Sequence, residues 1–271
     1  MDERNALELN AATRIDRKRR KERHVKRPGF VLLLGAWLWA FPQPSEAEWF
    51  IDVYLGKSAT LNADLRIKQP ANNSDFTVQD LSFDDESFSD PPYYGARVGY
   101  FFESYPAFGV ALEFFHFKML AETKESKLFT GTWNGAAINT VQPVNSVVQR
   151  FDISHGVNYL TVDALFRNAM FVDQDRFPRG RVQAYVGIGP GAVITHPENR
   201  VEGANNNEEF ELGGFGFQTF VGLKLLLLKH LGLFGEYKFS HSSLRVDLST
   251  GHAKVDENTH HAVFGVTVPF P

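Results

Sequence analysis

Apolar and polar residues alternate along eight segments between residues 49 and 270. In the first segment, WFIDVYLG (residues 49–56), Trp49, Ile51 and Val53 share one face of an extended chain, and Phe50 and Asp52 share the other. A period of two is typical of strands with one apolar and one polar face. The other segments with this period are residues 94–102, 108–118, 157–167, 181–191, 215–225, 231–243 and 260–270.

The connections between these segments alternate in length. The long, polar ones are residues 59–92, 119–150, 195–213 and 244–258, and the shorter ones are 103–107, 168–180 and 229–230. Strict alternation places all long connections at one end of an antiparallel barrel, as in outer-membrane barrels with long external loops. Each segment is also about as long as the 9 to 11 residues that cross a bilayer at a tilt. We therefore predict an all-β fold, an eight-stranded up-and-down antiparallel transmembrane β-barrel with four long extracellular loops.

A soluble barrel of the lipocalin type is the alternative, and it would place apolar residues inside and polar residues outside. The apolar faces here carry Phe, Leu, Tyr and Trp, whereas the opposite faces are rich in glycine with isolated charges. An eight-stranded barrel has little room inside, so glycine and paired charges fit the interior and bulky groups fit the outside. This distribution favours the membrane barrel.

Eight charged residues then point into the lumen, four acids against four cations. An unpaired ion in a confined interior is costly, so we expect mutual salt bridges, supported by hydrogen bonds to Gln183, Gln218 and tyrosines. A wide aqueous channel needs about 16 strands. The pattern thus predicts a plugged polar lumen, with a narrow porin-like channel for small solutes as the alternative. The predicted network consists of Asp52, Arg97, Glu113, Asp163, Arg167, Lys224, Glu236 and Lys238.

The first 47 residues differ from the rest of the chain. A basic block at residues 17–27 precedes the apolar run FVLLLGAWLWAF (residues 30–41), and Ser45 and Ala47 form a small-x-small site. This order is typical of a secretory signal peptide, and 12 apolar residues are too few to span a bilayer as a helix. We expect residues 1–47 to be a signal peptide with a long basic n-region and 48–271 to form the barrel domain. An uncleaved anchor behind a basic tail is the alternative, and the true start could lie downstream of Met1.

Charge and composition narrow the function. Residues 48–271 hold 18 Lys and Arg against 26 Asp and Glu, a net charge of −8, which argues against nucleic acid as a partner. The chain has no run of about 20 apolar residues, which argues against a helical membrane protein. It has no cysteine, so disulfides are not possible. No Walker A motif, dinucleotide fingerprint or zinc-finger spacing occurs, and we expect no cofactor.

The chain resembles the OmpA-like family of eight-stranded outer-membrane β-barrels from residue 48 onward. The resemblance rests on WFIDVYLG, RVGYFF, GVALEFFHF, AYVGIGPG, LFGEYKFSHSS and THHAVFGVTVPF. It implies a monomer in a Gram-negative outer membrane, among lipid and lipopolysaccharide, that serves membrane anchorage, surface adhesion or small-ligand exchange without shared catalytic residues. The last segment is similar to the strand that outer-membrane assembly machinery reads, although Pro271 follows Phe270. The resemblance leaves no room for a peptidoglycan-binding domain after the last strand.

A second resemblance points to an enzyme. His241 and Ser243, separated by one residue, look like the His-x-Ser of outer-membrane lipid A deacylases, in which His activates the Ser nucleophile. An acid that orients the His could be Asp247 or Glu257, and Leu244 replaces the family's Asn. The pattern places both groups on the lipid-facing side. We expect no enzyme activity and keep the deacylase as an alternative.

Metal and ligand sites are indicated only weakly. His252, His260 and His261 could bind a metal, but two of them are adjacent and so lie on opposite strand faces. The acidic residues 84–86, with Asp90, could attract calcium, although a solvated acidic loop is the simpler interpretation. We predict no metal site. Residues 130–135 and 205–207 are expected to be exposed contact surfaces for an extracellular ligand that the sequence does not identify.

Overall fold

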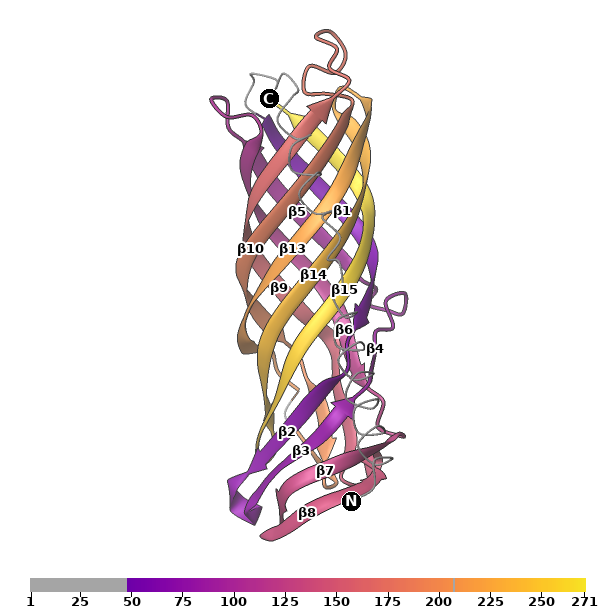
Figure 1. Cartoon of the computed structure of the whole chain (residues 1–271), viewed down its shortest axis with the longest axis vertical. Helices are drawn as coiled ribbons and strands as arrows, with labels where there is room; N and C mark the ends of the chain where they lie inside the picture. The colour runs from indigo at the N-terminus through magenta and orange to yellow at the C-terminus, as the bar shows by residue number, and fades with distance from the viewer. Residues whose placement is uncertain (1–47, 207) are drawn as a thin grey trace, which may run out of the picture. The chain divides into compact units, whose positions relative to one another are not determined.

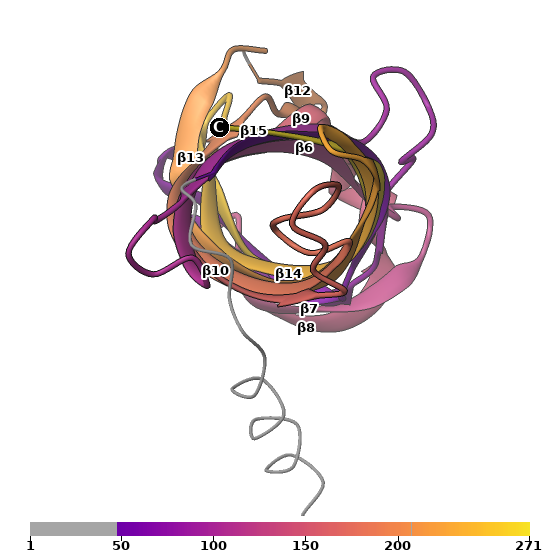
Figure 2. The same cartoon turned by 90° about the horizontal axis from the view of Figure 1, so that it is seen from above.

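Eight long antiparallel strands close into a barrel in the computed structural model, which describes residues 48–206 and 208–271 (Figures 1 and 2). The predicted fold class is confirmed, whereas the predicted signal peptide, residues 1–47, lies outside the described residues. No helix in the described part of the chain is long and apolar enough to cross a bilayer. In ring order the strands are β1 (Glu48–Thr60), β5 (Tyr94–Phe101), β6 (Phe108–Ala121), β9 (Val148–Met170), β10 (Val182–Thr195), β13 (Glu211–Leu228), β14 (Leu231–Leu248) and β15 (Gly251–Phe270).

The first and last strands close the ring. β1 pairs antiparallel with β15 from Trp49 opposite Phe270 to Thr60 opposite Thr259. Every other neighbouring pair in the ring is also antiparallel, which agrees with an up-and-down order. Closure gives each strand of the ring a hydrogen-bonded neighbour on both sides, as a barrel in a bilayer requires.

The alternation in the sequence becomes an alternation between outside and inside. In β1 every second side chain from Glu48 is buried, and those between are exposed. The exposed residues are large and apolar, and they include Val53 (55% exposed), Leu112 (54%), Val162 (61%), Leu223 (57%) and Phe264 (60%). A lipocalin-like barrel has the opposite polarity, so the soluble alternative does not describe this chain.

The two ends of the barrel differ. Residues 102–107, 171–181 and 229–230 make the turns at one end, which we call the short-turn end. The second of these turns was expected to begin at residue 168, but β9 runs to Met170, so the turn begins three residues later. The opposite end carries the long connections, which fold into further strands, and Figure 1 shows them continuing the barrel wall beyond the ring.

The expectation of four long, polar loops is wrong. Residues 244–258 are not a loop, because β14 runs to Leu248 and β15 begins at Gly251, which leaves a two-residue turn. The other three long connections contain short strands: β2 (Ala63–Gln69), β3 (Ser74–Leu81), β4 (Phe83–Asp84), β7 (Ser126–Trp133), β8 (Ala136–Pro143), β11 (Glu198–Val201) and β12 (Ala204–Asn205). One single turn of 3-10 helix, Pro70–Asn72, lies between β2 and β3, and another, Val144–Ser146, lies between β8 and β9.

These strands form what we call the extension, which includes the outer ends of β6, β9, β14 and β15. From β15 the sheet continues in the order β2, β3, β7, β8, while β11 pairs with β9. The extension has an apolar interior, because alternate residues of its strands point inward and are almost inaccessible to solvent. These residues include Leu65, Ile67, Phe76, Val78, Phe129, Val148, Ile153, Val246 and Val255. Burial of this apolar surface explains why long connections with many polar residues still fold.

Candidate functional site: the charged lumen

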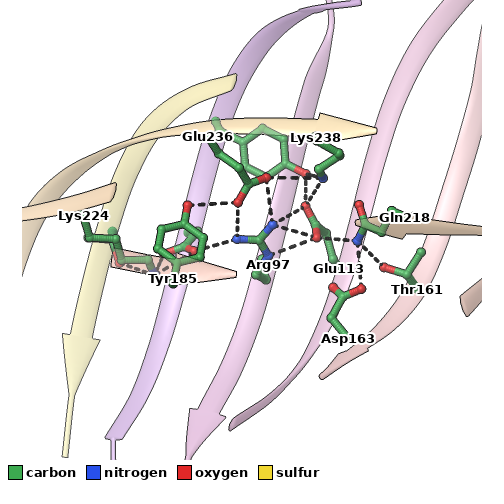
Figure 3. Close-up of polar contacts among 12 residues, drawn as sticks. Arg97, Glu113, Thr161, Asp163, Tyr185, Gln218, Lys224, Glu236 and Lys238 are labelled. Carbon is green, nitrogen blue, oxygen red and sulfur yellow. Dashed lines mark hydrogen bonds and ion pairs between the residues drawn. The ribbon is translucent and has the colours of Figure 1, made fainter. Parts of the chain in front are cut away.

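All eight charged residues that the alternation assigns to the lumen are buried, each 6% exposed or less. The side chains come from every strand of the ring except β10 and β15. Three acids and three cations among them are joined by ion pairs into one cluster, and Figure 3 shows the part of it around Arg97. This cluster, which we call the central network, consists of Asp52, Arg97, Glu113, Lys224, Glu236 and Lys238. Its formal charges balance, which a buried group of ions requires.

Arg97 is the centre of this network. Its guanidinium donates from Nε to Oε2 of Glu113 at 3.0 Å and from Nη2 to Oε1 at 3.0 Å, a bidentate pair. Nη1 lies 2.9 Å from Oε2 of Glu236 and 3.4 Å from Oδ2 of Asp52. Arginine presents its donors in a planar fork, so one side chain can bind carboxylates from three strands.

Two lysines complete the central network. Lys238 donates to Oε1 of Glu113, and Lys224 donates to both oxygens of Asp52 at 2.8 and 2.9 Å. Neutral donors satisfy the remaining lone pairs, because Gln218 donates to Oε2 of Glu113 at 2.7 Å. Hydroxyl groups donate as well, from Tyr54 to Glu113 and from Tyr185 to Glu236.

The other two lumen charges form no ion pair with the central network among the described contacts, which corrects the expectation of mutual salt bridges among all eight. Arg167 pairs with Oε2 of Glu48 at 2.6 Å, near the short-turn end, and donates to the carbonyl of Pro106 at 3.0 Å. Asp163 accepts from Gln218 at 2.9 Å, and its second oxygen has no hydrogen-bond partner among the described residues. Glu48 begins β1, outside the clear part of the alternating pattern, and so was missed.

Cation–π contacts inside the barrel are a feature that the sequence reasoning does not predict. The expected interior contains glycine, paired charges and tyrosine hydroxyls, whereas in the structure each of the four predicted lumen cations lies over an aromatic ring at a distance that suits a cation–π contact. The cation-to-centroid distances are 4.2 Å for Arg97 and Phe220, 3.7 Å for Arg167 and Phe101, 3.9 Å for Lys224 and Phe50, and 4.1 Å for Lys238 and Phe115.

Glycines make room for these rings by cross-strand pairing. Phe50 lies directly opposite Gly99, and a Cβ on that glycine would lie 2.2 Å from the ring. Gly187 is opposite Phe220 in the same way, again with a 2.2 Å approach. An inward ring therefore covers a glycine on the neighbouring strand, and the glycines serve the packing of rings rather than an open space. If the strand register were known, aromatic residues opposite glycines in the sequence would predict these inward rings.

A second polar layer lies toward the extension. The carboxylate of Glu257 accepts hydrogen bonds from Tyr159 at 2.5 Å, from Ser240 at 2.8 Å and from Ser242 at 3.0 Å. Ser240 also contacts Nε2 of His261 at 2.9 Å. Tyr159 stacks on Phe115 at 4.8 Å between ring centroids, so aromatic packing adjoins this layer.

The structure does not assemble the candidate hydrolase site. His241 and Ser243 lie on the outer face of β14 as expected, but each is bonded elsewhere: His241 Nδ1 to Asn258 at 2.9 Å and Ser243 to Asp256 at 2.5 Å. Glu257 is fully buried on the opposite face of the sheet, and Asp247 accepts no bond from His241 among the described contacts. The acid that would orient the imidazole is therefore absent from the described surroundings of His241.

The weaker metal candidates are also not assembled. Within the described residues, His252, His260 and His261 do not come together as ligands, and neither do the acidic residues 84–86. Lys57 lies 3.2 Å from the carboxylate of Asp85, which the backbone amide of Ser87 also binds. The group of closely spaced ligands that the structure does contain is elsewhere, at His155, His196 and Glu198.

Glu202 ties together the connections at the far end of the extension. Its carboxylate accepts from the indole of Trp133, from Asn134 at 3.4 Å and from Asn72 at 2.9 Å. The expected contact surface at residues 130–135 is thus the tip of the β7–β8 hairpin, and Trp133 in it is half-buried. Of residues 205–207, the first two are described, and Asn206 donates to the Pro197 carbonyl at 3.0 Å.

Comparisons with known proteins find resemblance only in solved structures. No protein-family model and no curated protein sequence matches the chain. Neisserial surface protein A is 10% identical, over 83% of this chain and 97% of that chain, with a TM-score of 0.39. The outer membrane protein OprG of Pseudomonas aeruginosa is 9% identical over 84% and 98%, with a TM-score of 0.40. The outer membrane protease OmpT of Escherichia coli is 6% identical over 86% and 100%, also with a TM-score of 0.40.

These resemblances are distant in both identity and TM-score. No residue role, ligand or activity is carried over from them to this chain. Membership of the OmpA-like family stays a prediction, because the motifs that suggest it are diffuse and no family model matches.

Proposed function

We propose that this protein is a closed-lumen outer-membrane barrel that anchors the extension at the cell surface, where the extension makes the functional contacts. The observation that carries the proposal is the central network, which fills the barrel with paired ions at the level of Arg97 and Glu113. Transport through the lumen would require these ion pairs to separate, and breaking a buried pair is costly.

The outer surface supports the membrane location. Its exposed apolar side chains face outward from all eight strands of the ring. Aromatic groups cluster toward both limits of this surface: Trp49 and Tyr100, with ring centroids 4.9 Å apart, near the short-turn end, and Tyr94 and Phe114, 6.1 Å apart, toward the extension. Aromatic girdles at both interfaces are typical of outer-membrane barrels. Lipid and lipopolysaccharide are therefore the proposed surroundings of the belt.

The extension supports the surface role. It folds around its own apolar interior, so it presents a fixed surface rather than loose loops. β8 ends the described sheet on one side, and its sequence AAINTVQP contains no charged residue. Edges without charges are open to pairing with an added strand. An extended peptide segment of a partner is the ligand class that such an edge fits.

Single-channel recording tests the closed lumen. The full chain purified in detergent and inserted into planar bilayers should give no large, stable open state. A stable open state of that kind in the wild-type protein would refute the proposal. A variant with Arg97, Glu113 and Lys238 all replaced by Ala loses the centre of the network and should raise the conductance, provided that heat-modifiable migration on gels shows it to be folded.

Surface accessibility tests the orientation. An epitope inserted between Asn134 and Gly135, at the β7–β8 turn, should be detected by antibody on intact cells. The same epitope inserted in the turn at residues 171–181 is the matched control and should be detected only after the outer membrane is permeabilised. The reverse result would place the extension in the periplasm and overturn its proposed surface role.

A further inference from the structure

Two histidines and a glutamate meet on the side of the extension, in residues that the lumen does not use. His155 comes from β9, His196 from the connection after β10, and Glu198 from the start of β11. One ligand atom from each lies within 4.8 Å of the other two. The β9–β11 pairing, with Glu198 opposite Asp152, brings these segments together.

A bulge in β9 aims His155 at this point. β6 and β9 pair at Phe117 with Val157 and next at Met119 with Ile153, so β9 has two more residues than β6 in this interval. The bulge contains Gly156, which has φ +113°. A Cβ there would also lie 2.1 Å from Nδ1 of His116, so only glycine fits. Bulges commonly re-aim a side chain in this way.

The carboxylate of Glu198 is already oriented. Ser154 donates to its Oε1 at 2.5 Å, and Arg150 pairs with its Oε2. Oε1 of Glu198 lies 2.6 Å from Nδ1 of His155. One oxygen is thus held by an arginine, and the other faces the imidazoles.

The two imidazoles are adjacent, and the ring of His155 is more exposed to solvent than that of His196. Their ring centroids are 4.8 Å apart, and His196 also packs on Phe210 at 4.6 Å. Nδ1 of His196 is buried and has no hydrogen-bond partner within the described residues. The side chain of His155 is 56% exposed, so an ion from solvent can reach the group.

We propose that His155, His196 and Glu198 bind a divalent transition metal of the zinc class, with water as the fourth ligand. Imidazole and carboxylate are ligands that Zn²⁺ takes in tetrahedral sites, whereas Ca²⁺ and Mg²⁺ require mainly oxygen. Ligand atoms of a tetrahedral zinc lie about 3.3 Å apart. The exposed His155 side chain reaches this spacing by rotation, and the metal replaces its direct contact with Glu198.

Ser154 and Arg150 would then act as outer-shell groups that hold the carboxylate, as such partners do in known sites. The ion would join β9 to the connection between β10 and β11. This role is independent of the lumen and of any channel activity, so the failure of one proposal leaves the other intact.

Titration of the full chain in detergent with ZnCl2 tests the proposal by calorimetry. We expect one equivalent of zinc to bind saturably, and Co²⁺ to give the visible bands of four-coordinate nitrogen and oxygen ligation. His155→Ala removes an exposed ligand with little risk to folding, and it should weaken binding by at least about tenfold, as should His196→Ala. His252→Ala removes an imidazole elsewhere in the extension and should leave binding unchanged.

Three results would overturn the proposal. The first is the absence of saturable zinc binding by the wild-type protein. The second is equal zinc affinity in the wild type and in both the His155 and His196 variants. The third is binding of CaCl2 by the wild type with the same affinity as ZnCl2. Thermal unfolding provides a second measurement, because zinc should raise the midpoint of the wild type but not that of His155→Ala.

Discussion

The substitution Glu113→Gln tests the physical basis of the closed lumen. Glu113 accepts hydrogen bonds from four side chains, namely Tyr54, Arg97, Lys238 and Gln218. Glutamine has nearly the same shape, so the change leaves no cavity. It removes one negative charge from a buried network of three acids and three cations, which leaves two acids for three cations.

The expected loss is large because the remaining cations cannot reach water. Arg97 and Lys238 are 1% and 0% exposed. Removal of one partner of a buried ion pair costs about 3–5 kcal/mol, most of it from the charge left without compensation. We therefore expect Glu113→Gln to lower the free energy of unfolding by about 3–5 kcal/mol.

Unfolding by urea from phospholipid vesicles, followed by tryptophan fluorescence, measures this change. Glu125→Gln is the matched control, since Glu125 pairs with Lys127 at 3.0 Å in the extension and its side chain is 45% exposed. Water solvates the exposed carboxylate and screens its charge, so this control should change the unfolding free energy much less than Glu113→Gln does.

A second variant tests charge balance directly. Lys238→Met added to Glu113→Gln restores equal numbers of acids and cations. The double variant should be more stable than the sum of the two single losses predicts, with a coupling of about 1–3 kcal/mol. The reasoning is refuted if Glu113→Gln behaves like the Glu125 control, or if the two lumen substitutions are simply additive.

Three further predictions concern packing, the extension and pH. Gly99→Ala places a methyl group against the inward ring of Phe50 and should destabilise the barrel by about 1–3 kcal/mol in the same unfolding assay. Gly235→Ala is the control, because the atom nearest to the added Cβ is 4.0 Å away, and it should not destabilise the barrel. Glu202→Ala removes the hydrogen-bond acceptor shared by the tips of the extension, so backbone amides of β7 and β8 should exchange hydrogen faster, while those of the ring should not change. Equal exchange rates of β7 and β8 in the variant and the wild type would contradict this role. A side-chain hydrogen bond from Arg66 lowers the pKa of Asp75, so this pair should stabilise the extension above the unfolded-state pKa of about 3.9 and lose its effect as pH falls through the lower folded-state pKa. Asp75→Asn should abolish that part of the pH dependence, measured by amide exchange of β2 and β3.

The period of two was enough to predict the barrel and its polarity. Side chains alternate strictly along an extended chain, so the inward face of Arg97 or Glu236 follows from the apolar neighbour on the other face, Val98 or Tyr237, without any knowledge of neighbouring strands. For the same reason the eight lumen charges could be named from the sequence. The signal peptide at residues 1–47 is assigned from the order of its basic block, apolar run and small-x-small site, and that assignment stays a prediction.

The long connections show where a local pattern is insufficient. Residues 244–258 contain Arg245, Asp247 and Lys254, and this composition predicts a polar loop, yet the residues form a regular hairpin. Their strand character comes from pairing with β2 and from the burial of Val246 and Val255 within the extension. Those contacts involve residues far apart in the sequence, so the local composition contained little sign of them.

The sequence by itself determined which side chains point inward and which outward, because that depends on one strand at a time. The tertiary structure alone decided which of the inward charges meet. Arg97 reaches Glu236, 139 residues away, while Asp163 is left with Gln218. The bulge at Gly156 likewise brings His155 to Glu198. Such meetings depend on strand register and on the stagger of a closed barrel, which are set by all eight strands together.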